Sequence, residues 1–178
     1  IPIFGADDKE AKAMGINGQR AGQGGWCLSY RGSEWSKRMD EYKGYLTKGV
    51  NFFAFDDVSP STCFCDKCKQ SFAEFLEINT KLPYIEPTMF LKEGWDGNDE
   101  YKTLWNDFPL WHYGKTAQDM KNELVHYALT KGLNKNIYFG ISSWLPFTHS
   151  FAAESLTAFD FDIRQIYINW ASSGYGGS

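Results

Sequence analysis

Apolar and polar residues alternate with helical spacing in three stretches of the chain. In segment 33–49, Trp35, Met39, Tyr42 and Leu46 recur at the spacing of one helix face. Ser33 is a residue type favoured at an N-cap, and Gly49 is one favoured just after the last helical turn. The pattern therefore predicts a helix that begins near Ser33 and ends before Gly49.

Two further helices are predicted later in the chain. Residues 65–78 place Phe72, Phe75 and Leu76 on one face, which is typical of an amphipathic helix. Residues 100–132 repeat a helical period up to Gly132, and Pro109 within them predicts an interruption. The stretch 79–98 is rich in Pro, Gly, Asn and Asp and predicts a long excursion between these helices.

Short, nearly continuous apolar runs predict strands that are buried on both faces. These runs are "VNFFAFDD" at 50–57, "IYFGISSW" at 137–144 and "IRQIYINW" at 163–170. Helices and strands alternate along the chain, which favours an α/β fold with a parallel sheet.

Three strands are too few for a closed eight-stranded barrel of about 250 residues. The chain is therefore expected to be either a compact open α/β domain or a portion of a (β/α)8 TIM barrel. Long βα loops, and polar or aromatic residues at the ends of the strands, favour the barrel. We expect residues 1–170 to form the partial barrel domain and 171–178 to form a flexible tail.

Composition and charge exclude some classes of partner. Lys and Arg total 18 against 22 for Asp and Glu, a net charge of -4, so nucleic acid is not an expected partner. No apolar run approaches 20 residues, so no membrane span is predicted, and no export signal is visible that would indicate a compartment. Aromatic residues make up 17% of the chain, which suits either a thick core or a site that stacks on sugar rings.

The cysteines have the most specific spacing in the sequence. Cys63, Cys65 and Cys68 form a C-x-C-x2-C pattern, and Cys27 lies upstream of the helix and strand that precede this pattern. Three crowded thiols are awkward to pair as disulfides, because bridged Cα atoms lie about 5.5 Å apart with specific vectors. The spacing favours a structural zinc ion with four thiolates over one or two disulfides, although both remain open.

Other candidate site residues stand at the ends of the predicted strands. Asp56 and Asp57 end one strand, and either could be a general acid/base or a loop-capping group. Trp144 and Trp170 could line a sugar subsite or belong to the core. The histidines have no metal-ligand spacing and are assigned structural or solvent roles: His112, His126 and His149.

Residues 20–80 resemble the middle of glycoside hydrolase family 42 β-galactosidases. The resemblance is carried by a cysteine followed by "SYRGSEWSKRMDEYKGYLTKGVNFFAFDD", then C-x-C-x2-C and "KQSFAEFLE". It implies a structural zinc ion held by the four cysteines, and it aligns Asp56 and Asp57 with the Asn-Glu of the family. Asp57 would then be the acid/base carboxyl and Asp56 would contact the substrate.

The sequence departs from that family at the carboxylates. Asp57 is one methylene shorter than Glu, and a retaining glycosidase needs a second carboxylate about 5 to 5.5 Å from the first, which the family takes from a later strand. The nucleophile is expected outside the given sequence or in another chain, or it is absent. The expected partners are carbohydrate and either the remainder of a larger chain or further copies in a homo-oligomer. The hypothesis is retaining hydrolysis of a β-linked glycoside. The alternative is a catalytically inactive carbohydrate-binding or structural protein derived from a barrel.

Overall fold

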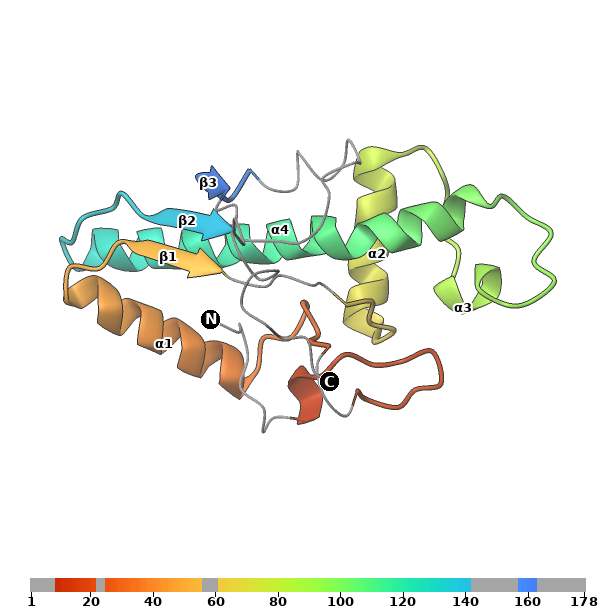
Figure 1. Ribbon diagram of the computed structural model, residues 1–178, viewed down its shortest axis with the longest axis horizontal. Coiled ribbons are helices and arrows are strands. Elements are labelled where there is room, and N and C mark those ends of the chain that lie inside the picture. The colour runs from red at the N-terminus through yellow and green to blue at the C-terminus, as the bar shows by residue number, and fades with distance from the viewer. Residues whose placement is uncertain (1–8, 22–24, 56–60, 142–156, 163–178) are drawn as a thin grey trace, which may run out of the picture.

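The computed structural model describes residues 9–21, 25–55, 61–141 and 157–162 (Figure 1). In chain order the elements are a 3₁₀ helix η1 (Lys9–Ala11), α1 (Ser33–Thr47), β1 (Phe52–Phe55), α2 (Asp66–Asn79), α3 (Pro87–Phe90), α4 (Glu100–Thr130), β2 (Tyr138–Ile141) and β3 (Phe161–Asp162). The strands form one parallel sheet in the order β1-β2-β3. In its register Phe52 lies opposite Tyr138 and Phe55 lies opposite Ile141.

Helix α1 confirms the first predicted helix. Its buried residues are the four of the predicted face: Trp35, Met39, Tyr42 and Leu46. The N-cap is Gly32, and Ser33 is the first helical residue. Gly49 has a φ of 87°, the left-handed conformation that glycine adopts readily after a helix.

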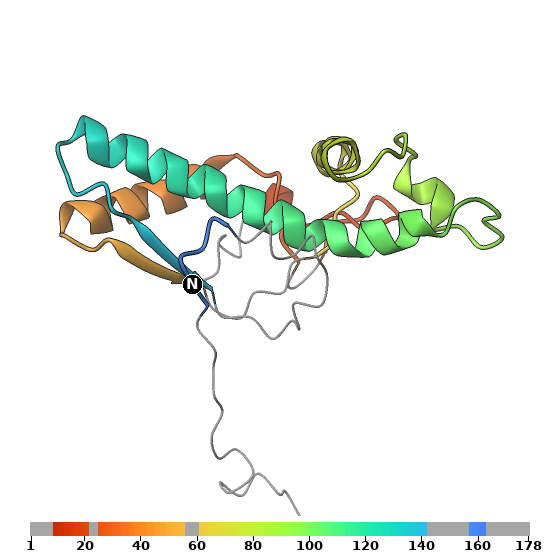
Figure 2. The ribbon, with the colours of Figure 1, turned by 90° about the horizontal axis from the view of Figure 1, so that it is seen from above.

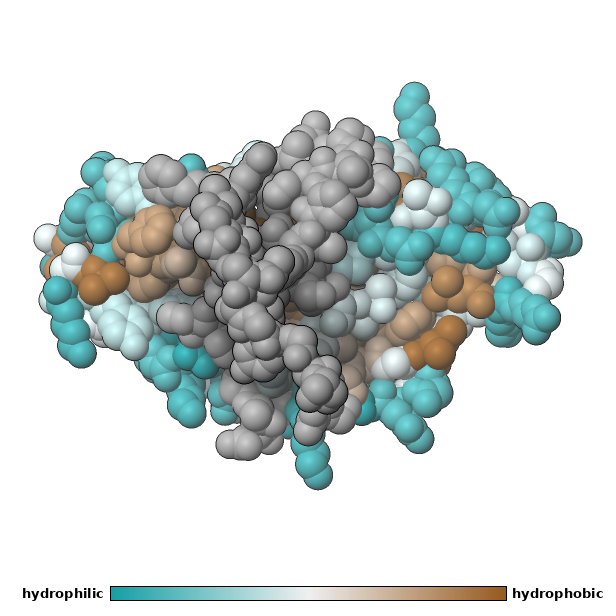
Figure 3. All heavy atoms as spheres, viewed as in Figure 1, coloured by the Kyte–Doolittle hydropathy of each residue, from teal (hydrophilic) through white to brown (hydrophobic). Residues whose placement is uncertain are grey.

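The sheet is covered by helices on one face. Figure 2 shows α1 and the second half of α4 on the same side of β1 and β2. Phe53, Phe55 and Phe139 are buried on that side, and the rings of Phe55 and Phe139 lie 4.9 Å apart. Phe52 and Tyr138 are exposed, 43% and 38%, and Figure 3 shows apolar side chains gathered where the two strands begin. The prediction that β1 is buried on both faces is therefore wrong, since β1 alternates between exposed and buried residues.

The described residues form two separate hydrophobic cores. The first core lies between α1, the sheet and the second half of α4, and includes Met39, Tyr42, Phe55, Met120, Leu124 and Phe139. The second core lies between α2, α3 and the first half of α4: Phe72, Phe75, Leu76, Phe90, Tyr101, Leu104, Trp105 and Phe108. Helix α2 confirms the second predicted helix, because its predicted apolar face is buried in this second core.

Helix α4 runs through both cores without a break. It spans 31 residues and contains Pro109, so the predicted interruption is wrong. A proline inside a helix lacks one backbone hydrogen bond, at a cost of about 3 kcal/mol. Here the residues next to Pro109 are packed tightly, because Phe108 is 1% exposed and its ring stacks on His112 at 5.0 Å. This packing offsets the missing hydrogen bond and keeps the helix continuous.

The fold prediction of a (β/α)8 barrel portion is wrong. Over the described ranges the chain is mostly helical, with four α-helices and a small parallel sheet of two four-residue strands and a two-residue third. A barrel alternates single strands with single helices, whereas α2, α3 and α4 all intervene between the adjacent strands β1 and β2. The parallel α/β pairing was predicted correctly, but the barrel arrangement was not.

Candidate metal centre

Cys27 ends an irregular N-terminal segment that doubles back on itself. Antiparallel bridges pair Lys12 with Trp26 and Met14 with Arg20. The Cys27 backbone N–H donates to the carbonyl of Ala11 at 2.8 Å, which fixes the cysteine on this folded segment. Cys27 is therefore held by backbone hydrogen bonds before any ligand contributes.

The other three cysteines lie where the chain enters α2. Cys65 is the N-cap residue of α2 with extended backbone, and Cys68 lies three positions later in the first turn. Residues three apart in a helix lie on the same side, so both sulfurs point the same way. Cys63 lies just before this turn, where Phe64 N–H donates to the Met14 carbonyl at 2.8 Å and joins the turn to the N-terminal segment.

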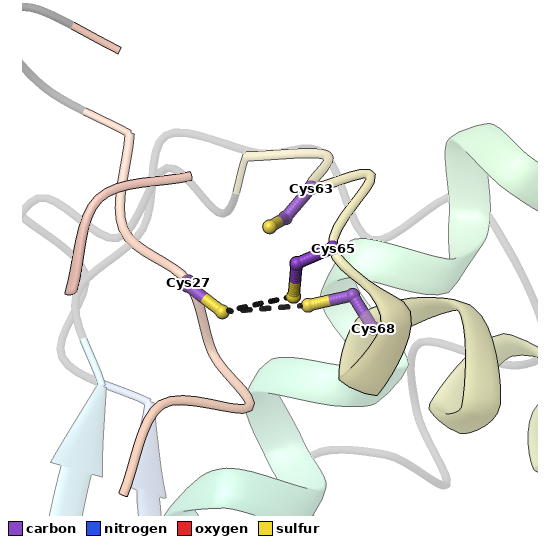
Figure 4. A group of neighbouring side chains, drawn as sticks. All are labelled: Cys27, Cys63, Cys65 and Cys68. Atoms are coloured by element: carbon purple, nitrogen blue, oxygen red, sulfur yellow. Dashed lines mark hydrogen bonds between the residues drawn. The ribbon is translucent and has the colours of Figure 1, made fainter. Parts of the chain in front are cut away.

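The four sulfur atoms converge on one point, as Figure 4 shows. All four Sγ atoms lie within 4.8 Å of one another, and those of Cys65 and Cys68 are each 3.6 Å from that of Cys27. These cysteines are free, and an S–S bond would need about 2.05 Å. Three are buried at 3% exposure or less, and Cys65 is half-buried. The four cysteines are thus close enough to bind one metal ion.

The cluster shares its protons unevenly. Hydrogen bonds from neighbouring thiols, first that of Cys27, lower the pKa of Cys65, and they lower that of Cys63 to about 7. The pKa of Cys27 and of Cys68 is raised, because these thiols supply the protons for the same hydrogen bonds. Metals bind thiolates, so the protons that the four thiols still hold would be released on binding.

Comparison with protein families, curated proteins and solved structures gave no match.

Of the predicted site residues, the structure brings together the four predicted metal ligands. Asp56, Asp57, Trp144 and Trp170 lie outside the described residues, so their predicted roles stay predictions. Residues 171–178, the predicted tail, also lie outside them. No described helix is both long enough and apolar enough to cross a lipid bilayer.

Polar residues that were not predicted to belong to the site lie directly behind the cysteines. Ser29 Oγ is 3.4 Å from Cys68 Sγ, 3.0 Å from His112 Nε2 and 3.4 Å from Ser71 Oγ. These contacts bring α2 and α4 to the segment that carries Cys27. Ser29 and His112 are 83 positions apart, so no local pattern could have paired them.

Two clefts flank the centre. One of about 400 Å³ opens over the half-buried Cys65, with Arg20 and Lys67 in its wall. The other, of about 330 Å³, lies over Ser29 and His112, and is bordered by the Arg31–Asp119 ion pair at 2.8 Å and by the pair of Lys115 with Glu74. Solvent can therefore reach the sulfur cluster from the side of Cys65.

Proposed function

We propose that Cys27, Cys63, Cys65 and Cys68 hold one zinc ion, and that this ion is structural. The observation that carries the proposal is the convergence of four sulfurs. With Zn–S bonds of about 2.3 Å, a tetrahedral ion places its ligands about 3.8 Å apart. The 3.6 Å separations from Cys27 to Cys65 and to Cys68 agree with that spacing.

The number and type of ligands support a structural role. A catalytic zinc ion keeps one position open for water or substrate, whereas four thiolates occupy all four positions of a tetrahedral ion. The centre also joins parts of the molecule that belong to different cores. Cys27, Cys63 and Cys68 are all buried in the first core, and Cys68 lies in the first turn of α2, whose Phe72 lies in the second core.

Metal analysis of the purified native protein tests this proposal. We expect one zinc per chain by elemental analysis and native mass spectrometry, with no thiol reactive until the metal is chelated. Cys68→Ser should lose the metal, and Ser36→Ala, which changes an exposed hydroxyl on α1, should retain it. An iron-loaded centre would contradict the choice of metal, because tetrahedral sulfur sites also suit iron. A metal-free protein with four reactive thiols or with disulfides would refute the site.

Hydrolysis of a β-linked glycoside stays a prediction from the sequence resemblance. What supports it is the cysteine pattern, together with the position of Asp56 and Asp57 directly after β1, since the carboxyl ends of parallel strands are common sites for working groups. We expect Asp57→Asn to abolish turnover of an aryl β-glycoside if Asp57 is the acid/base. Sugar binding by calorimetry without any turnover would instead favour the inactive carbohydrate-binding alternative.

A further inference from the structure

A hydrogen-bond chain runs from the sulfur cluster into α4. Its members are Cys68 Sγ, Ser29 Oγ and His112 Nε2, with successive distances of 3.4 Å and 3.0 Å. Cys68 is 1% exposed and His112 is 4% exposed, whereas Ser29 between them is half-buried and lines the cleft of about 330 Å³. Three separate segments of the sequence meet in it.

Metal binding would set the direction of every hydrogen bond in this chain. A metal-bound thiolate has no proton and can only accept, so the Ser29 hydroxyl must donate to Cys68 Sγ. A hydroxyl has one donor and two acceptor positions. With the donor position used on Cys68, the two acceptor positions of Ser29 Oγ match its two other neighbours, His112 and Ser71. Nε2–H of His112 then donates to Ser29, as does the Ser71 hydroxyl at 3.4 Å. All three hydrogen bonds of Ser29 are satisfied at once.

The surroundings of His112 favour a neutral imidazole, whose Nε2–H can donate a hydrogen bond. Burial, together with the nearby charges of Arg31 and Lys115, lowers the pKa of His112 to about 3. A serine beside a histidine is also the arrangement of a nucleophile and its base. A general base works best with a pKa near the operating pH, and a histidine with a pKa near 3 accepts protons poorly. The pair is therefore better suited to holding a fixed hydrogen bond than to activating Ser29.

We propose that Ser29 and His112 are positioning residues of the metal centre, which orient Cys68 and stabilise the negative charge on its sulfur. This inference rests on the proposed function of the four cysteines as a metal site. Hydrogen-bonded groups behind the ligands commonly contribute 10–100-fold to metal affinity. The hydrogen bonds from Cys68 through Ser29 to His112 also connect the metal centre to α4, a helix that contributes none of the four ligands.

Four variants and a matched control test the inference. Ser29→Ala removes the donor to Cys68, and Ser29→Thr retains a hydroxyl. His112→Phe retains a flat ring that can stack on Phe108 but has no donor, whereas His112→Gln retains an N–H donor without the ring. Ser36→Ala is the control, because Ser36 is exposed on α1 and its hydroxyl donates to the Gly32 carbonyl.

The measurements are zinc affinity, by competition with a chromophoric chelator, and the sulfur-to-metal charge-transfer band of the cobalt(II)-substituted protein. We expect Ser29→Ala and His112→Phe each to weaken zinc binding by about 10–100-fold, and Ser29→Ala to move the band to longer wavelength. Ser29→Thr should retain more zinc affinity than Ser29→Ala, and His112→Gln more than His112→Phe. If His112 only packs against Phe108, His112→Phe should bind zinc more tightly than His112→Gln, which is the reverse of the expected order.

The outcomes separate this inference from the proposed function. A wild-type protein that binds no metal overturns both. A wild-type protein that binds zinc, with Ser29→Ala and His112→Phe binding it equally well, overturns only the positioning roles. If Ser29→Ala fails to fold, the order of the two His112 variants still decides the question.

Discussion

Removing the metal should destabilise the protein by an amount that the zinc affinity sets. The four sulfurs come together only in the folded chain, so the ion binds the folded state and not the unfolded one. An ion of this kind stabilises the folded state by about 4 kcal/mol when free zinc is about 1,000 times its Kd. In a domain of this size, 1 kcal/mol shifts Tm by about 2–4 °C, so chelation should lower Tm by about 8–16 °C.

The loss of stability should also be uneven along the chain. The second half of α4 and strands β1 and β2 are held by the first core, where Met120, Leu124 and Phe139 are fully buried. Residues 25–32 and 61–68 carry the ligands, and besides the cysteines they bury only Leu28 and Tyr30 in the first core, with Trp26 and Phe64 partly buried. Hydrogen exchange in these two segments should therefore accelerate on chelation much more than exchange in α4.

The assay is thermal unfolding and hydrogen exchange of the zinc-loaded protein before and after chelation, with zinc release monitored by a dye. Cys68→Ser serves as the control and should show no response to the chelator. The reasoning is refuted if zinc is demonstrably removed while Tm changes by less than about 2 °C, since a shift that small corresponds to 1 kcal/mol or less. An acceleration of exchange spread evenly over all helices would refute the claim of a local link.

Three further outcomes follow from the packing and the charges. Phe72→Ala should cost about 3–5 kcal/mol in urea unfolding, because Phe72 is 0% exposed and contacts Trp105 at 4.9 Å, whereas the 43% exposed Phe52 should tolerate alanine at below about 1 kcal/mol. His112 has a pKa near 3 when folded and about 6.5 when unfolded, so the unfolded state takes up the proton first as pH falls and stability is lost below about pH 6.5. With metal in excess, the stability of wild type relative to His112→Phe should fall by about 2 kcal/mol between pH 7 and pH 5, and an unchanged difference would contradict the burial of a neutral histidine. The Asp160 carboxylate accepts hydrogen bonds from Lys121 Nζ and from the Phe139 N–H, each at 2.7 Å. Asp160→Asn should weaken both and so raise amide hydrogen exchange at Phe139. Unaltered exchange at Phe139 would count against the contact between its N–H and Asp160.

The sequence predicted local features well because local rules govern them. The face of α1 depends on a spacing that four apolar residues show, and Gly49 ends the helix by its own conformational freedom. The convergence of the cysteines was predictable because three of them lie within six positions. These predictions needed no knowledge of distant contacts.

The predictions that failed depend on tertiary contacts. Pro109 breaks an isolated helix, but α4 continues because Phe108 and its neighbours are packed on the second core. Barrel closure depends on how many strands pair and in what order, which the apolar run of β1 does not encode. Ser29 and His112 meet only because α4 passes behind the N-terminal segment, and neither residue has a distinctive sequence neighbourhood.

The sulfur cluster lies close to the helix that connects the two cores. Helix α4 is the element that runs through both cores, and its hydrogen-bond ladder is weakest at Pro109, where the N–H is missing. His112 lies one turn beyond that point and contacts Ser29, which contacts Cys68. The sulfur cluster is therefore connected through Ser29 to the part of α4 that lacks one backbone hydrogen bond. A metal ion there would fix α2 against the N-terminal segment, so that bending at Pro109 would have to break the Ser29–His112 hydrogen bond as well.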